Sequence, residues 1–133
     1  MFLGFLRDNQ KIPFLTLSHK LLDSDGAGKV AQSELELLEA MKNELQVHVD
    51  VASLNGDEKE LSQAFKDHRE RHAAMLELIG LAFVDNEFAE AEKNFLLCLS
   101  KKWAISESRF SDMVNWVRRQ LDLVREAKRF LED

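Results

Sequence analysis

Proline and glycine are scarce in this chain, whose 133 residues include one proline, Pro13, and five glycines. All-β folds need many tight turns, and tight turns use these two residues heavily. Apolar residues recur instead at the spacing of one helix face, as at Phe14, Leu17 and Leu21. The sequence therefore predicts an all-α fold, and its length suits a single domain covering residues 1–133.

Helical patterns cover most of the sequence and are separated by short polar breaks. They predict helices over residues 12–22, 31–45, 57–84, 89–103 and 106–131. The wholly polar stretch 67–72 favours a break inside the third of these, and Ser106 is placed as the N-cap of the last. Residues 47–54 fit either a short helix or an extended link.

The chain is acidic, with a formal net charge of −6 at pH 7. Such a surface repels nucleic-acid backbones and anionic membranes, so metal cations or basic protein partners fit better. The apolar start, residues 1–6, is too short for a signal peptide, and we expect it to fold back onto the domain. No run is long enough to span a bilayer, so we expect no membrane insertion.

Cys98 is the single cysteine, so no intramolecular disulfide can form. A chain without disulfides suits a reducing compartment, and we therefore expect a cytoplasmic location. Leucines surround Cys98 in the sequence, which indicates that it packs as a small buried hydrophobe.

The last predicted helix, residues 106–131, carries apolar residues on two sides. The first side holds Phe110, Met113, Val114, Val117, Leu121 and Val124, and the second holds Trp116, Leu123 and Phe130. A helix with two apolar faces is either central to its bundle or covered by another subunit. We favour the central position, with a homodimer as the alternative.

The two halves of the chain align with each other. An offset of 58 residues carries Val30 to Phe88, Glu34 to Glu92, Leu38 to Leu96 and Leu45 to Trp103. Each copy contains a helix, an acidic loop, a hydrophobic residue and a glutamate four positions later. This pattern predicts two related helical hairpins, although any two amphipathic helices can be slid into a common hydrophobic register.

Acidic residues gather at the two loops of these hairpins. They are Asp23, Asp25 and Glu34 in the first, and Asp85 and Glu92 in the second. Glutamates in a first helical turn complement the helix dipole, whereas aspartates at a helix C-terminus are unfavourable. Aspartate also forms turns, which leaves solvated turns as one interpretation. The other is weak binding of a divalent cation, calcium or magnesium, by these five residues.

Residues 23–34 also match part of an EF-hand loop. Loop positions 1, 3, 6 and 12 are filled by Asp23, Asp25, Gly28 and Glu34. Ala27 and Ala31 offer no side-chain ligand at positions 5 and 9, and no second loop of this length fits. A degenerate single EF-hand with a dissociation constant of roughly 10⁻⁴ M or weaker is therefore an alternative.

The segment from Leu81 to Ser106 resembles the second motif of the TerB-like helical domain. That family is named for tellurite-resistance proteins and also occurs at the start of a membrane-anchored DnaJ-type co-chaperone. Its motif is an apolar helix, Ala-Asp-Gly, a hydrophobic residue and a helix-starting glutamate. Here the corresponding residues are Val84-Asp85-Asn86, Phe88 and Glu92. The first half matches through Ser24-Asp25-Gly26 and the segment from Val30 to Glu34, with two extra residues between them.

The resemblance implies a TerB-like multihelical bundle made of two related hairpins and a long C-terminal helix. It also implies metal binding or protein interaction at Asp25, Glu34, Asp85 and Glu92, rather than catalysis. Asn86 replaces the usual glycine but tolerates the same left-handed turn. The two extra residues of the first loop put the ligand role of Asp25 in question.

Catalytic motifs are missing from the sequence. His68 and His72 share a helix face, but Arg69 stands where a metalloprotease motif needs glutamate. No nucleophile elbow, P-loop or dinucleotide fingerprint is present. We therefore expect a non-enzymatic TerB-like module that binds divalent cations weakly and contacts a protein partner. The alternatives are the degenerate EF-hand and a structural scaffold that binds no metal.

Overall fold

The computed structural model describes residues 1–24, 31–83 and 88–132, and these contain six α-helices and no strand. The predicted all-α fold is therefore confirmed. The helices are α1 (Asp8–Leu22), α2 (Gln32–Leu45), α3 (Glu58–Gln63), α4 (His68–Ala82), α5 (Glu90–Lys102) and α6 (Glu107–Leu131), with the short 3₁₀ helices η1 (Leu3–Phe5) and η2 (Val51–Ser53).

Helices α1 and α4 form the centre of the bundle. α1 contacts α2, α3, α4 and α5, and α4 contacts α5 and α6 on its other sides. Their fully enclosed apolar residues include Phe14, Leu15, Leu17, Leu21, Ala74, Met75, Leu78 and Ile79. Both helices bury apolar residues around much of their circumference, as a helix with neighbours on several sides requires.

A buried polar contact joins α1 to α4 near their N-termini. Gln10 is 2% exposed, and its Nε2 donates to Glu70 Oε2 at 2.5 Å and to the Ala64 carbonyl at 3.1 Å. The guanidinium of Arg7 forms an ion pair with the other oxygen of Glu70. A buried carboxylate needs such partners, because removing it from water without them costs several kcal/mol. The contact therefore sets the position of one central helix against the other.

The helical stretch predicted over residues 57–84, with a break at 67–72, is two helices, α3 and α4. The chain turns at Phe65, whose side chain is fully buried and packs on Trp103 with ring centroids 5.1 Å apart. The Trp103 indole donates to the Ser62 carbonyl at 2.9 Å, and Arg71 Nε donates to the Phe65 carbonyl at 2.6 Å. The break thus precedes the polar stretch 67–72, which forms the first turns of α4.

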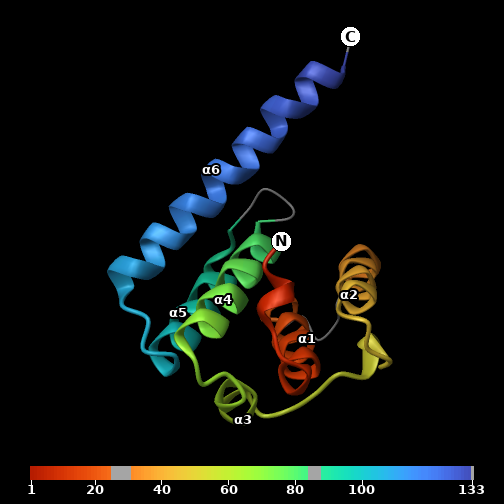
Figure 1. Ribbon diagram of the computed structural model, residues 1–133, viewed down its shortest axis with the longest axis vertical. Coiled ribbons are helices and arrows are strands. Elements are labelled where there is room, and N and C mark those ends of the chain that lie inside the picture. The colour runs from red at the N-terminus through yellow and green to blue at the C-terminus, as the bar shows by residue number, and fades with distance from the viewer. Residues whose placement is uncertain (25–30, 84–87, 133) are drawn as a thin grey trace.

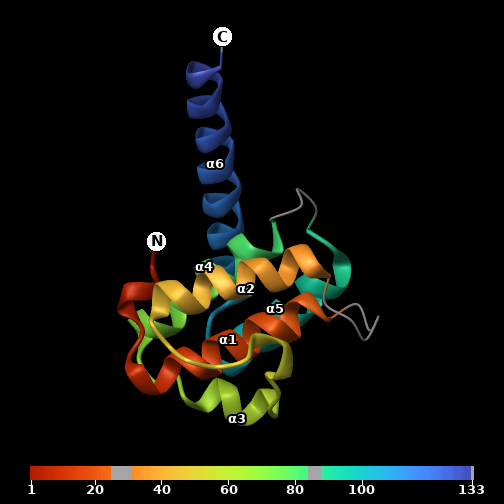
Figure 2. The same ribbon diagram turned by 90° about the vertical axis from the view of Figure 1, so that its right-hand side faces the viewer.

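Helix α6 starts on the body and ends away from it. Phe110, Met113, Val114 and Val117 are buried, and α6 contacts α4 and α5. Its second half projects from the rest of the molecule (Figures 1 and 2). There Leu123 is 63% exposed and Phe130 is 88% exposed, so the prediction of a central α6 is wrong.

Three local predictions have clear outcomes. The apolar start folds back as η1, with Leu3 and Leu6 buried, as predicted. Ser106 is the N-cap of α6, and its hydroxyl accepts from the Arg109 N–H at 3.1 Å, also as predicted. Cys98 is exposed, so its predicted burial is wrong. α5 buries the face that carries Leu96 and Leu99, and Cys98 lies off that face.

None of the helices that the structure describes combines the length and the apolar character needed to cross a bilayer.

We predict that Glu70→Ala lowers the free energy of unfolding by about 2 kcal/mol, because it leaves the buried Gln10 amide short of an acceptor. The loss of the Arg7–Glu70 ion pair adds little to this value, because the Arg7 side chain is largely exposed. Urea denaturation measures the change. The exposed helical variant Glu36→Ala is the control and is expected to change stability by less than about 0.5 kcal/mol. Equal stability of the two variants would contradict the role given to Glu70.

Candidate functional site

Two of the five predicted metal ligands, Asp25 and Asp85, lie outside the described residues. Asp23 follows α1 directly, and its backbone N–H bonds the His19 carbonyl at 3.1 Å. The Asp23 Oδ1 and the Ser24 hydroxyl are buried, and neither has a hydrogen-bond partner in the described part of the chain. Buried polar atoms are nearly always bonded, so these two atoms lack, among the described residues, the partner that such atoms usually have.

Glu34 and Glu92 occupy the same position in their helices, the third residue of α2 and of α5. Glu34 Oε1 accepts from the Ala31 N–H at 3.0 Å, and Glu92 Oε1 accepts from the Ala89 N–H at 3.3 Å. In a capping box, the side chain of the third helical residue accepts a hydrogen bond from the backbone N–H of the N-cap residue. Glu34 and Glu92 both make this bond, which satisfies a backbone donor at the helix start. Both glutamates therefore have a structural role.

The same two helices also end alike. Gln46 after α2 and Ala104 after α5 adopt left-handed backbone, with φ of 59° and 58°. In both, the next N–H bonds a carbonyl five residues back, at 3.3 Å from Val47 and 2.8 Å from Ile105. α2 and α5 thus share their local geometry at both ends.

Within the described ranges, no group of three or more His, Cys, Asp or Glu side chains could hold a metal ion. Asp23, Glu34 and Glu92 are therefore not brought together as a metal centre. The EF-hand alternative depends on residues 25–30, which are outside the described residues, and so it remains a prediction.

His68 and His72 stack with ring centroids 3.8 Å apart, and His72 Nδ1 lies 2.7 Å from the His68 carbonyl.

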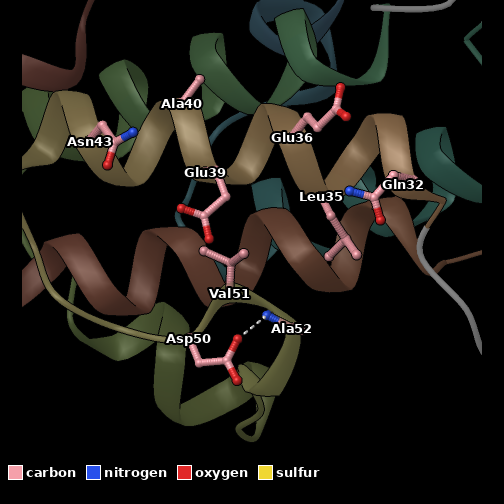
Figure 3. A pocket seen from close by; sticks show the side chains of 9 residues that line it. All are labelled: Gln32, Leu35, Glu36, Glu39, Ala40, Asn43, Asp50, Val51 and Ala52. Atoms are coloured by element: carbon pink, nitrogen blue, oxygen red, sulfur yellow. Dashed lines mark hydrogen bonds between the residues drawn. The ribbon is translucent and has the colours of Figure 1, made fainter.

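A groove of about 420 Å³ lies between α2 and the segment that contains η2 (Figure 3). It is lined by Gln32, Leu35, Glu36, Glu39, Ala40, Asn43, Asp50, Val51 and Ala52. Leu35 and Glu39 point from α2 toward Val51, and Asp50 stands on the opposite rim, whereas Glu36 points to the other side of the helix. The groove therefore combines an apolar floor with a carboxylate on each side.

Asp50 is held as a fixed negative charge. It accepts hydrogen bonds from the Ser53 hydroxyl at 2.8 Å and from the Ala52 N–H at 3.1 Å. These bonds lower the pKa of Asp50 below its ordinary value of 3.8, the Ser53 bond contributing most. Across the groove, Glu39 pairs with Lys42 one turn away at 2.7 Å.

Sequence reasoning missed this groove. The α2 wall carries a signal, because Leu35 and Glu39 are one helical turn apart and share a face. The opposite wall comes from residues 47–54, whose pattern was ambiguous between helix and extended link. No local rule predicts that Asp50 and Val51 face α2.

A second hollow, of about 400 Å³, lies at the base of α6. It is lined by Phe2, His72, Leu76, Arg109, Asp112, Met113 and Trp116. The Phe2 and Trp116 rings meet with centroids 5.8 Å apart. His72 Nε2 is buried there without a hydrogen-bond partner among the described residues, and burial lowers the pKa of His72 below 6.5.

We predict that the free energy of unfolding decreases as the pH falls from about 6.5, because the unfolded chain binds a proton at His72 more readily than the folded one. The His72→Gln variant removes the ring and should lose this part of the pH dependence. The control is His48→Gln, at an exposed position, which should keep it. Denaturation at a series of pH values tests this, and unchanged pH dependence in His72→Gln would contradict it.

Comparison with known proteins finds no match to any family model, curated protein or solved structure. The resemblance to the TerB-like domain therefore stays a prediction from short motifs.

Proposed function

We propose that this chain is a non-catalytic helical module, related to TerB-like domains, that binds a basic segment of another protein. The proposed site is the groove between α2 and η2. The observation that supports it is the pairing of an apolar floor, Leu35 and Val51, with carboxylates on both rims, Glu39 and Asp50.

Lysine and arginine side chains suit such a groove. Their aliphatic stems cover apolar surface while their charged ends stay at the rim. Hydrogen bonds between a cationic donor and a carboxylate are stronger than those between neutral groups. The net charge of −6 also attracts a basic segment toward the molecule before contact.

The rim carboxylates differ in how readily they accept a new partner. Asp50 is already ionised and oriented by Ser53 and Ala52, so binding requires little reorganisation. Glu39 already pairs with Lys42 at 2.7 Å, and the Lys42 side chain is 20% exposed. An incoming basic residue therefore competes with Lys42 for Glu39.

A second candidate function, weak binding of calcium or magnesium at the acidic loops, is favoured by one observation. Asp23 Oδ1 is buried beside the first loop without a hydrogen-bond partner in the described residues. The matching ends of α2 and α5 support a duplicated hairpin, in which Asp25 and Asp85 have related positions. A cation at the first loop gives the Asp23 oxygen the partner that it lacks.

We predict that Asp50→Asn combined with Glu39→Gln weakens binding of a synthetic peptide rich in lysine and leucine by roughly tenfold or more. Fluorescence anisotropy of the labelled peptide measures the change, and added salt should reduce it. The control is Glu44→Gln combined with Glu60→Gln, which removes the same charge at exposed positions that do not line the groove. Equal weakening by both double variants would mean that net charge alone attracts the peptide.

We predict heat of binding when calcium or magnesium is titrated into the chelator-treated protein, with loss of that heat in Asp23→Ala. The Asp85→Ala variant separates the two metal interpretations. A single EF-hand-like loop predicts unchanged binding in Asp85→Ala, whereas two related loops predict partial loss. Absence of heat with both ions in the unaltered protein would leave the acidic loops as turns.

A further inference from the structure

The projecting half of α6 carries one broad apolar face. Successive residues of an α-helix are rotated by about 100° around its axis. Trp116, Leu123 and Phe130 therefore lie along one line of the helix surface, and Val124 and Leu131 lie along the neighbouring line. The two apolar sides read from the sequence are therefore neighbouring strips of a single face. The exposed fractions are 38% for Trp116, 63% for Leu123, 45% for Val124, 88% for Phe130 and 86% for Leu131.

We propose that a second copy of this chain covers this face, through antiparallel pairing of the two α6 helices with their crossing point at Leu123. Exposed area, residue spacing and charge support a second copy over other occupants.

The accessible surface is larger than a compact monomer of this size needs. A chain of 15.3 kDa is expected to expose about 7,100 Å², whereas this one exposes 8145 Å². The excess of about 1,000 Å² compares with the roughly 800 Å² that each partner buries in a stable interface. A projecting helix adds surface to a monomer, so pairing along α6 would bury part of this excess.

The helix itself also needs a cover. Residues 118–131 are exposed or only partly buried, and isolated helices of roughly 12–15 residues are marginal in water. The Arg125–Asp122 ion pair at 3.1 Å is the kind of surface pair that adds only a few tenths of a kcal/mol. Packing of the apolar face against a second helix provides stability that the ion pair within α6 does not.

The spacing of the large side chains is symmetric about Leu123. Trp116 and Phe130 are each seven residues away, which is about 10.5 Å along the helix. In an antiparallel pair that crosses at Leu123, Trp116 of each copy lies level with Phe130 of the other. The hollow beside Trp116 offers apolar contacts for that phenyl ring from Phe2, Leu76 and Met113, and its other lining residues are His72, Arg109 and Asp112.

Charges along one edge of the face fit the same arrangement. Arg119 and Glu126 lie two turns apart on this edge, on either side of Leu123. Antiparallel pairing sets Arg119 of each copy near Glu126 of the other, whereas parallel pairing sets like charges together. The net charge of the chain, −6, opposes an anionic membrane, whereas residues 118–131 carry five basic and two acidic side chains. Binding to anionic vesicles is therefore the competing outcome that the experiment must separate from dimerisation.

Sedimentation equilibrium over a concentration series tests the proposal. The unaltered chain should approach twice its mass of 15.3 kDa. Leu123→Asp combined with Phe130→Ser should raise the dimer dissociation constant by at least about a hundredfold, because each copy contributes both side chains. The control Arg129→Ser, on the opposite side of α6, should dimerise normally. A monomer at every concentration, or normal dimerisation of the double variant, would overturn the proposal.

Crosslinking tests the direction of pairing without relying on a destabilising change. In a Cys98→Ser background, Arg119→Cys protein is mixed with Glu126→Cys protein and treated with a short bis-maleimide. The antiparallel pair predicts crosslinks between the two variants and few within either one. Crosslinks of like with like would overturn it. So would an unaltered chain that stays monomeric and binds vesicles containing anionic lipid, because the face then serves a membrane.

Discussion

Mutual burial of α1 and α4 is the constraint on which the rest of the structure depends. These helices enclose most of their side chains in each other and in their neighbours, so every other element is placed against one of them. Polar groups buried in these helices need partners: Thr16 and Ser18 donate to carbonyls of their own helix, and Gln10 bonds Glu70 and the Ala64 carbonyl. This contact fixes the relative position of two helices whose apolar surfaces alone would allow sliding.

Sequence periodicity predicted the helices well because it reports local structure. The ends of α1 and α4, the starts of α2 and α5, the Ser106 cap and the folded-back start follow from neighbouring residues. The sequence did not predict which helices form the centre of the bundle. The apolar pattern of α6 has two sides, and such a pattern occurs both in buried helices and in helices with an uncovered face. The exposure of Cys98 could not be predicted for a similar reason, because the leucines around it in the sequence do not indicate which side of α5 faces the core.

The acidic residues separate into two groups by what their oxygens bond. Glu34 and Glu92 cap helices, which accounts for their place in the sequence without any ligand. Asp50 caps the short helix η2 and also lies on the rim of the groove. Asp23 Oδ1 has no hydrogen-bond partner among the described residues. Capping depends on residues two or three positions apart, so the sequence can explain it. The groove depends on a chain reversal over residues 46–52, which is a tertiary property.

Helix α6 runs without interruption from the body into solvent, so the packing of its base sets the direction of its tip. Its base packs against Phe2 and the histidine-lined hollow, and its tip lies about 20 Å beyond Val117. A tilt of 10° at the base therefore displaces the tip by about 4 Å. A small change in how Phe2 packs on the base of α6 would therefore move the far end of the helix by several times that distance.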